Sequence, residues 1–225
     1  LFLHMQNKVL ILDFGSQYTQ LIARRVRELN VYCEIHPFNK IPKDLDSFKA
    51  LILSGSPYSV READSPRVNL DILLSKFPTL AVCYGAQLIA QEMGGVVSAS
   101  NIREYGRANL VIKKNDSILF DGIENNNQVW MSHSDTIKQL PKNSLLLASS
   151  DDVENVAYKY MDNTYCLQFH PEVYHTVQGK KLLENFLTKI SKLKQTWTPD
   201  SFIDSTIQEV KTCLLYTSDA ADERL

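Results

Sequence analysis

The sequence lacks the marks of several protein classes. Its four cysteines are irregularly spaced and include no Cys-x-x-Cys pair, which argues against a disulfide framework and a zinc site. No apolar run approaches the roughly 18 residues of a membrane span, and the first residues lack the pattern of a signal peptide. Because 24 basic residues nearly balance 26 acidic ones, no charge excess favours nucleic acid or an anionic membrane. We therefore expect a cytoplasmic protein with no metal site and with neither nucleic acid nor a membrane as a partner.

What the sequence does contain is enough apolar material for a folded domain. Its 225 residues, 44% of them hydrophobic, can form one domain or one domain with part of another. We expect upstream read-through at residues 1–4, a folded domain over 5–191, a linker and lead-in over 192–212, and a non-native tail over 213–225. The tail resembles the translated end of a sequencing adapter, although Leu214 would also extend an apolar helical spacing.

Short apolar runs alternate with helical patterns in the first part of the chain. Each run has the continuous apolar character of a strand that is covered on both faces. The alternation predicts an α/β fold, with a mainly parallel open sheet and helices on both faces. The predicted strands are 8–12, 32–35, 50–53 and 79–82, and the predicted helices are 18–29 and 68–74.

The pattern changes after Gly106. Strand-like segments follow one another with connections too short for helices, so this part is expected to form a smaller antiparallel sheet. An amphipathic helix over 178–190 then completes the domain. The predicted antiparallel strands are 109–113, 129–131, 144–148, 156–160 and 165–169.

Cys83 stands where a strand is expected to turn sharply into a helix. The apolar run Leu80–Val82 leads into it, and Tyr84–Gln87 can begin the helix. Such a turn lifts the side chain out of the sheet, and the positive end of the helix dipole favours a negative charge on the sulfur. Gly85 is expected to supply the backbone freedom that the turn needs, as in nucleophile elbows. These features are typical of a nucleophile.

The other cysteines do not share this position. Cys33 and Cys166 lie inside apolar strands, where a thiol packs as a small hydrophobic group, and Cys213 lies in the expected non-native tail. For Cys83 itself, the pattern alone leaves a catalytic and a structural role equally open.

Among the five histidines, His170 is the best candidate for a partner base. It ends the apolar strand 165–169, and Glu172 follows two residues later, where it could orient the ring and stabilise its charged form. A nucleophile, a histidine and an orienting carboxylate are the members of a catalytic triad. His133 also ends a strand and could reach the same sheet edge. On the pattern alone, a structural corner at His170 stays open.

A cysteine with a His–Glu pair suits attack on an amide or ester carbonyl, with a thioester intermediate. Such attack needs backbone N–H groups that face the developing negative charge. The N–H of Tyr84 and one from the turn Ser54–Pro57 are natural donors. Gln87, one helical turn beyond Cys83, could hold a polar substrate.

Together these segments resemble the class I glutamine amidotransferase family, and within it the amidotransferase domains of the GMP synthases. The likeness covers residues 8–190 and implies a flavodoxin-like class I amidotransferase fold. The marks that carry it are Ser54-Gly55-Ser56-Pro57, Cys83-Tyr84-Gly85-Ala86-Gln87 and His170-Pro171-Glu172, and more narrowly Asp13–Thr19, Tyr105-Gly106, Trp130–His133 and Phe169–Thr176.

The resemblance implies that Cys83 attacks the side-chain amide of L-glutamine, that His170 delivers a proton to the departing ammonia, and that Glu172 holds His170. The family more often has glycine where Ser56 and Ser134 stand, so the oxyanion geometry is where this sequence departs from the pattern. The residues implied in oxyanion contacts are Ser56 and Tyr84, through their backbone N–H groups, and those implied in glutamine binding are Gly55, Gln87, Ser132, His133 and Asp135.

The resemblance further implies a partner domain. In GMP synthases an ATP pyrophosphatase domain uses ATP and Mg to aminate XMP to GMP in purine biosynthesis, and the full-length proteins are homodimers. The Ser-Gly-Gly-Val-Asp-Ser signature of that domain is absent here, and Trp197–Val210 resembles the lead-in to it. We expect this fragment to need no cofactor and to release ammonia without making GMP. The alternatives are an amidotransferase subunit of another synthase, a stand-alone glutamyl hydrolase, or a catalytically silent α/β interaction module.

Overall fold

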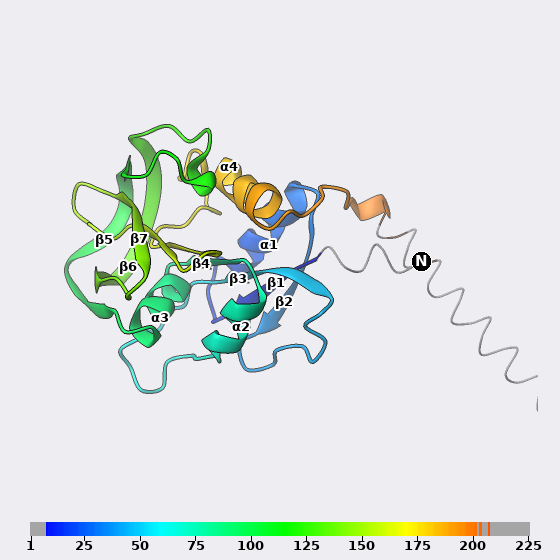
Figure 1. Ribbon diagram of the computed structural model, residues 1–225, viewed down its shortest axis with the longest axis horizontal. Coiled ribbons are helices and arrows are strands. Elements are labelled where there is room, and N and C mark those ends of the chain that lie inside the picture. The colour runs from blue at the N-terminus through cyan, green and yellow to red at the C-terminus, as the bar shows by residue number, and fades with distance from the viewer. Residues whose placement is uncertain (1–7, 202, 204–206, 208–225) are drawn as a thin grey trace, which may run out of the picture.

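A single mixed sheet organises the molecule (Figure 1). The computed structural model describes residues 8–201, 203 and 207, and these form nine strands in the order β2-β1-β3-β4-β9-β8-β7-β5-β6. The strands are β1 Lys8–Asp13, β2 Tyr32–Pro37, β3 Phe48–Leu53, β4 Thr79–Val82, β5 Val96–Ile112, β6 Asn127–Gln139, β7 Ser144–Ser149, β8 Ala157–Tyr160 and β9 Thr164–Leu167. The helices are α1 Thr19–Glu28, α2 Leu70–Lys76, α3 Tyr84–Glu92 and α4 Gly179–Glu184, with a short 3₁₀ turn η1 Ile118–Phe120 and a π-helical turn η2 Asn185–Ile190.

The parallel part of the sheet is buried on both faces. Successive residues of β1 belong to different hydrophobic clusters: Val9 and Ile11 pack with α1 and α4, whereas Leu10 and Leu12 pack with α2 and α3. Figure 1 shows the same division, with α1 and α4 on one side of the sheet and α2 and α3 on the other. A strand covered on both faces needs apolar residues at every position, which is why these strands are continuous apolar runs. The predicted α/β fold class is confirmed.

Strand β9 joins the two parts of the sheet. It pairs parallel to β4 and antiparallel to β8, and β7, β5 and β6 continue the antiparallel part. The sequence pattern assigned 165–169 to the antiparallel part alone, and in this respect the assignment was incomplete. An apolar run carries no information on the direction of its neighbours. Because β4 and β9 run in the same direction, their carboxyl ends lie at the same edge of the sheet.

The C-terminal helix is not a regular α-helix throughout. The pattern predicts one amphipathic helix over 178–190, whereas the structure changes from α4 to the π-helical turn η2 at Asn185. The buried Asn185 amide donates hydrogen bonds to the carbonyl oxygens of Leu119 (3.0 Å) and Asp121 (2.8 Å). The side chain that interrupts the apolar spacing therefore anchors η1 to the helix.

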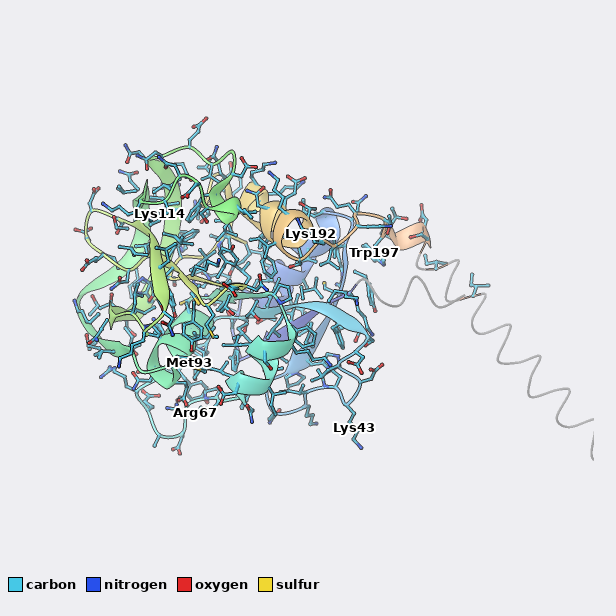
Figure 2. All side chains as sticks on the ribbon, in the orientation of Figure 1. Lys43, Arg67, Met93, Lys114, Lys192 and Trp197 are labelled. Carbon is cyan, nitrogen blue, oxygen red and sulfur yellow. The ribbon has the colours of Figure 1, made fainter. Side chains whose placement is uncertain are left out.

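Two apolar residues beyond position 191, in the stretch that the sequence suggests is a linker, contact the domain. Leu193 is buried in the cluster next to α1 and α4, and the backbone N–H of Trp197 donates to the Asn30 carbonyl at 2.8 Å. The Trp197 ring lies 6.0 Å from the ring of Tyr32, at the position that Figure 2 labels. A segment that is mostly polar thus contains two apolar anchors. The expected read-through at 1–4 and the expected tail over 213–225 lie outside the described residues.

Candidate active site

Cys83 occupies a strained turn between β4 and α3. It is the N-cap residue of α3 and has φ 50° and ψ −103°, a conformation that residues with a side chain rarely adopt. Its N–H donates to the Leu167 carbonyl at 2.7 Å, which ties the turn to the end of β9. The sulfur lies at the N-terminus of a buried helix and lines a pocket. The strain therefore falls on the residue whose side chain is presented to that pocket.

Gly85 serves the turn differently from the sequence prediction. Its backbone is within α3 and does not have a positive φ, so backbone freedom is not what the position requires. A Cβ at this position would lie 2.7 Å from Leu53 Cβ and 3.0 Å from the Leu53 carbonyl oxygen. The Gly85 N–H also donates to the Ser54 carbonyl at 3.2 Å. Glycine is needed because the first turn of α3 packs directly on the end of β3.

His170 follows β9 and is held by a buried carboxylate. Its Nδ1 lies 2.7 Å from Glu172 Oε1, and the side chains of His170 and Glu172 are 3% and 0% exposed. Burial lowers the pKa of the imidazole, but Glu172 and Cys83 outweigh burial and hold the pKa of His170 well above its ordinary value. An Nδ1–H that donates to the carboxylate leaves Nε2 for proton exchange with another group.

The backbone around His170 is also fixed. The His170 N–H donates to the Trp130 carbonyl at 3.0 Å, and the His170 carbonyl accepts from the Thr176 hydroxyl at 2.6 Å. The Tyr18 ring packs edge-on against the imidazole at 5.0 Å between centroids. These contacts come from β6, from the segment before α4 and from the N-cap of α1. The ring can therefore rotate little in its site.

One pocket of about 370 Å³ brings most of the predicted site residues together. Gly55 does not line it, but a Cβ at Gly55 would lie 3.4 Å from His170 Cε1, so glycine leaves room for the ring. Glu172 lies behind His170, away from the lining. The lining residues are Gly15, Ser16, Gln17, Tyr18, Ser56, Pro57, Tyr58, Cys83, Gln87, Tyr105, Ser132, His133, Ser134, Asp135 and His170.

The two predicted oxyanion residues lie at neighbouring strand ends. The Tyr84 N–H is the first of α3, a position without an acceptor inside the helix. The Ser56 hydroxyl donates to the Phe14 carbonyl at 2.7 Å and accepts from the Tyr58 N–H at 3.3 Å. The serine that stands where the family more often has glycine is thus used to fasten the turn to the end of β1.

Asp135 connects several parts of the pocket wall. Its carbonyl accepts hydrogen bonds from Gln87 Nε2 at 2.9 Å and from His133 Nδ1 at 2.8 Å. Its carboxylate accepts from the Ser59 hydroxyl and from Arg61, whose Nε and Nη2 lie 3.1 and 2.9 Å from Oδ1. Sequence reasoning missed Ser59 and Arg61. They belong to no motif, and only the fold brings them to a residue more than 70 positions later.

His133 and His170 share the pocket but differ in charge. Burial, the largest cause, lowers the pKa of His133 from 6.5 to about 4, the hydrogen bond to the Asp135 carbonyl opposes this shift, and His170 adds to it. His133 is therefore neutral at pH 7.

Among the residues that the structure describes, no group of three or more His, Cys, Asp or Glu side chains is arranged to hold a metal ion. Within the same residues, no helix combines the length and apolarity that crossing a bilayer requires.

The chain resembles known proteins over most of its length. Residues 10–190 match the family Glutamine amidotransferase class-I. The chain is 61% identical to the GMP synthase [glutamine-hydrolyzing] of Christiangramia forsetii and 58% identical to that of Flavobacterium psychrophilum, each over 208 residues. These alignments cover 92% of this chain and 41% of each relative, so the chain spans about two-fifths of the length of the curated relatives that it matches.

Solved structures agree with this grouping. A GMP synthase subunit from Thermoplasma acidophilum is 30% identical with a TM-score of 0.69, and the match covers 83% of this chain and 94% of that one. A glutamine amidotransferase from Thermotoga maritima shares the fold at 19% identity, with a TM-score of 0.68 and coverage of 83% and 99%. The chain therefore belongs to the class I glutamine amidotransferase family.

Proposed function

We propose that this chain is the glutaminase half of a GMP synthase and that it hydrolyses L-glutamine to glutamate and ammonia. The observation that supports this most is the meeting of Cys83 and His170 at one pocket, on the carboxyl ends of two parallel strands, with Glu172 hydrogen-bonded to His170 from behind. Ligands of open α/β sheets bind at this edge. The curated relatives are named for a glutamine-hydrolysing reaction.

The proposed reaction begins with the Cys83 proton already on His170, so that a thiolate lies beside an imidazolium. The sulfur attacks the carbonyl carbon of the glutamine side-chain amide, and a tetrahedral oxyanion forms. As the C–N bond breaks, protonated His170 gives its proton to the departing nitrogen, and ammonia leaves a thioester on Cys83. Neutral His170 then takes a proton from water, the hydroxide adds to the thioester carbon, and the C–S bond breaks to release glutamate. Glu172 stabilises the imidazolium in both halves of the cycle.

The surrounding residues are assigned to binding. The backbone N–H groups of Ser56 and Tyr84 would stabilise the oxyanion, in line with their places at two adjacent strand ends. Such donors stabilise the transition state most when their positions are fixed before the reaction. The two hydrogen bonds of the Ser56 hydroxyl hold the turn that carries the Ser56 N–H. The residues assigned to hold glutamine are Gly55, Gln87, Ser132, His133 and Asp135.

The fate of the ammonia is assigned by likeness to the relatives. We propose that an ATP pyrophosphatase domain, corresponding to length that the relatives have and this chain does not span, uses ATP and Mg to aminate XMP to GMP. The glutaminase itself would use no cofactor. In this assignment the whole enzyme is a cytoplasmic homodimer of purine biosynthesis. The support is the identity to GMP synthases over 41% of their length.

Replacing the nucleophile tests the proposal. Cys83→Ala should reduce glutamine hydrolysis at least about a thousandfold, because loss of a triad nucleophile removes the covalent route. Hydrolysis is measured as glutamate release, and the unfolding curve shows that the fold is intact. Hydrolysis retained by the variant would contradict the mechanism.

Covalent labelling tests the same nucleophile without turnover. A glutamine-analogue electrophile should label Cys83 alone, mapped by mass spectrometry. The internal controls are Cys33 and Cys166, because burial raises the pKa of their thiols to about 11 and about 12. Labelling at either of these two positions in place of Cys83 would count against the assignment.

A further inference from the structure

Arg61 lies outside the family motifs, yet it contacts the wall of the pocket. It is on the loop 54–69, between β3 and α2, and its guanidinium is paired with the carboxylate of Asp135 on β6. We infer that Arg61 is a positioning residue for the glutamine site and acts through Asp135. This inference rests on the proposed function.

The Asp135 carboxylate requires partners where it lies. Its side chain is 4% exposed, and a buried carboxylate is unfavourable unless it is paired and hydrogen-bonded. Both of its oxygens are engaged by the loop 54–69: Oδ1 by Nε and Nη2 of Arg61, and Oδ2 by the hydroxyl of Ser59. The resemblance suggests Asp135 as a glutamine contact, but its carboxylate faces protein donors. Its main-chain carbonyl is the part that organises the pocket.

The Arg61–Asp135 pair joins the two walls of the pocket. Pro57 and Tyr58 line it from the loop 54–69, and the residues from Ser132 to Asp135 line it from β6. The Asp135 carbonyl in turn holds the side chains of Gln87 and His133. A shift of Asp135 would therefore move both of these side chains.

The backbones at the two reacting groups are held by hydrogen bonds that do not involve this pair. Cys83 is held by its N–H bond to Leu167, and His170 by its N–H bond to Trp130. The Glu172 carbonyl accepts a hydrogen bond from Arg25 Nε at 3.0 Å. Losing Arg61 should therefore disturb the binding of glutamine more than the chemical step.

The same loop supplies a matched control. Arg67 is 40% exposed, close to the 44% of Arg61, and it is also paired with a carboxylate, that of Glu92. Glu92 is itself 39% exposed, and neither Arg67 nor Glu92 lines the pocket. Figure 2 labels Arg67 near Met93, the residue after α3. Arg67 also donates from Nη2 to the Val60 carbonyl at 2.9 Å, so Arg67→Gln reports any effect that comes from the loop backbone alone. The guanidinium charge of each arginine is paired with a different carboxylate.

The experiment compares KM and kcat for glutamine hydrolysis in matched variants. Arg61→Gln should raise KM about tenfold, equivalent to about 1.4 kcal/mol of binding, with kcat within about twofold. Arg61→Lys should recover part of the loss, because lysine restores the positive charge but not the planar guanidinium that donates two hydrogen bonds. Arg67→Gln should leave both constants unchanged. In an Asp135→Asn background, Arg61→Gln should raise KM no further.

Several outcomes would overturn the inference. They are equal KM values for the Arg61 and Arg67 variants, a loss confined to kcat, or effects of Arg61→Gln and Asp135→Asn that simply multiply.

Labelling of Cys83 distinguishes failure of the inference about Arg61 from failure of the proposed function. Iodoacetamide, which lacks an amino-acid head group, should react equally with the wild type and Arg61→Gln, whereas a glutamine-analogue electrophile should react more slowly with the variant. Equal rates with the analogue refute the inference alone. A wild type that reacts with iodoacetamide but not with the analogue refutes the proposed function and the inference together.

Discussion

Two histidines of one pocket illustrate how surroundings decide the charge of a residue. His170 has a carboxylate at 2.7 Å and Cys83 beside it, and together these raise its pKa against the effect of burial. The Nδ1–H of His133 donates to a backbone carbonyl, that of Asp135, and burial lowers the pKa of His133 to about 4. The protonated ring is thus next to the proposed nucleophile, and the neutral ring lies at the wall of the pocket. This division suits a site that must move protons at a single position.

The low pKa of His133 predicts a loss of stability in acid. The unfolded state binds a proton to this residue near pH 6.5, whereas the folded state does so near pH 4. The stabilising contribution is therefore complete above pH 6.5 and is lost as the pH falls toward 4, by about 3 kcal/mol in total. Urea unfolding at several pH values measures this loss.

The control for this prediction is His133→Asn, whose amide can still donate to the Asp135 carbonyl. The variant should lose about 3 kcal/mol less than the wild type over the same pH interval. Parallel curves for the two proteins would show that another group is responsible.

At the scale of the elements, two parallel strand ends create the site. β4 ends at Cys83 and β9 ends near His170, and the bond from the Cys83 N–H to the Leu167 carbonyl joins them directly. The apolar runs were sufficient to predict both strands, and the expected strand-to-helix turn distinguished Cys83 from the other cysteines while leaving its role open. The neighbours of β9 could not be predicted, because the direction of a strand pairing is not encoded in its apolar pattern.

Other details lay beyond sequence reasoning for a different physical reason. The need for Gly85 comes from a steric contact with Leu53, and the roles of Ser59 and Arg61 come from their contact with Asp135. Each of these contacts joins residues that are far apart in the chain. Residue type and local spacing report local geometry, so they cannot reveal such pairs. The sequence placed Cys83 and His170 at strand ends because a strand end depends on neighbours in the sequence.

The start of α4 packs on the segment that holds His170 in place. A Cβ at Gly179 would lie 1.9 Å from the carbonyl oxygen of Pro171, and the atom in the way is backbone. Gly179→Ala should therefore destabilise the fold by about 1–3 kcal/mol or more, as overpacking does. It should also slow glutamine hydrolysis, because Pro171 lies between His170 and Glu172. Chemical denaturation and glutamate release measure the two effects.

Lys180→Ala is the adjacent control for Gly179→Ala. Lys180 is exposed, so its substitution should change neither the stability nor the rate of hydrolysis appreciably. If Gly179→Ala behaved like Lys180→Ala, the contact with Pro171 would not constrain the segment.

At the scale of the whole molecule, the folded unit is completed by residues that follow the last helix. The chain leaves η2 at Ile190, and the Leu193 N–H then donates to the Leu187 carbonyl at 2.9 Å. Gln195 Nε2 donates to the Leu29 carbonyl, and the backbone N–H of Trp197 donates to the Asn30 carbonyl. Both acceptors lie just after α1. This segment has the composition of a polar linker because only two of its residues are large and apolar. Both of them pack against the domain, and they connect its C-terminal end to α1 and β2.

Shortening the chain on either side of this segment tests how far the folded unit extends. A chain that ends after Thr198 keeps Leu193 and Trp197 and should unfold at the same urea concentration as the whole chain. A chain that ends after Ser191 loses the burial of Leu193, which is 4% exposed. It should lose about 2–5 kcal/mol, the usual cost of removing a buried leucine side chain. Leu193→Ala in the whole chain should reproduce most of this loss, and the exposed Lys194→Ala should not. Equal midpoints for the two shortened chains would place the end of the domain at Ser191, because the contacts of Leu193 and Trp197 would then contribute nothing to folding.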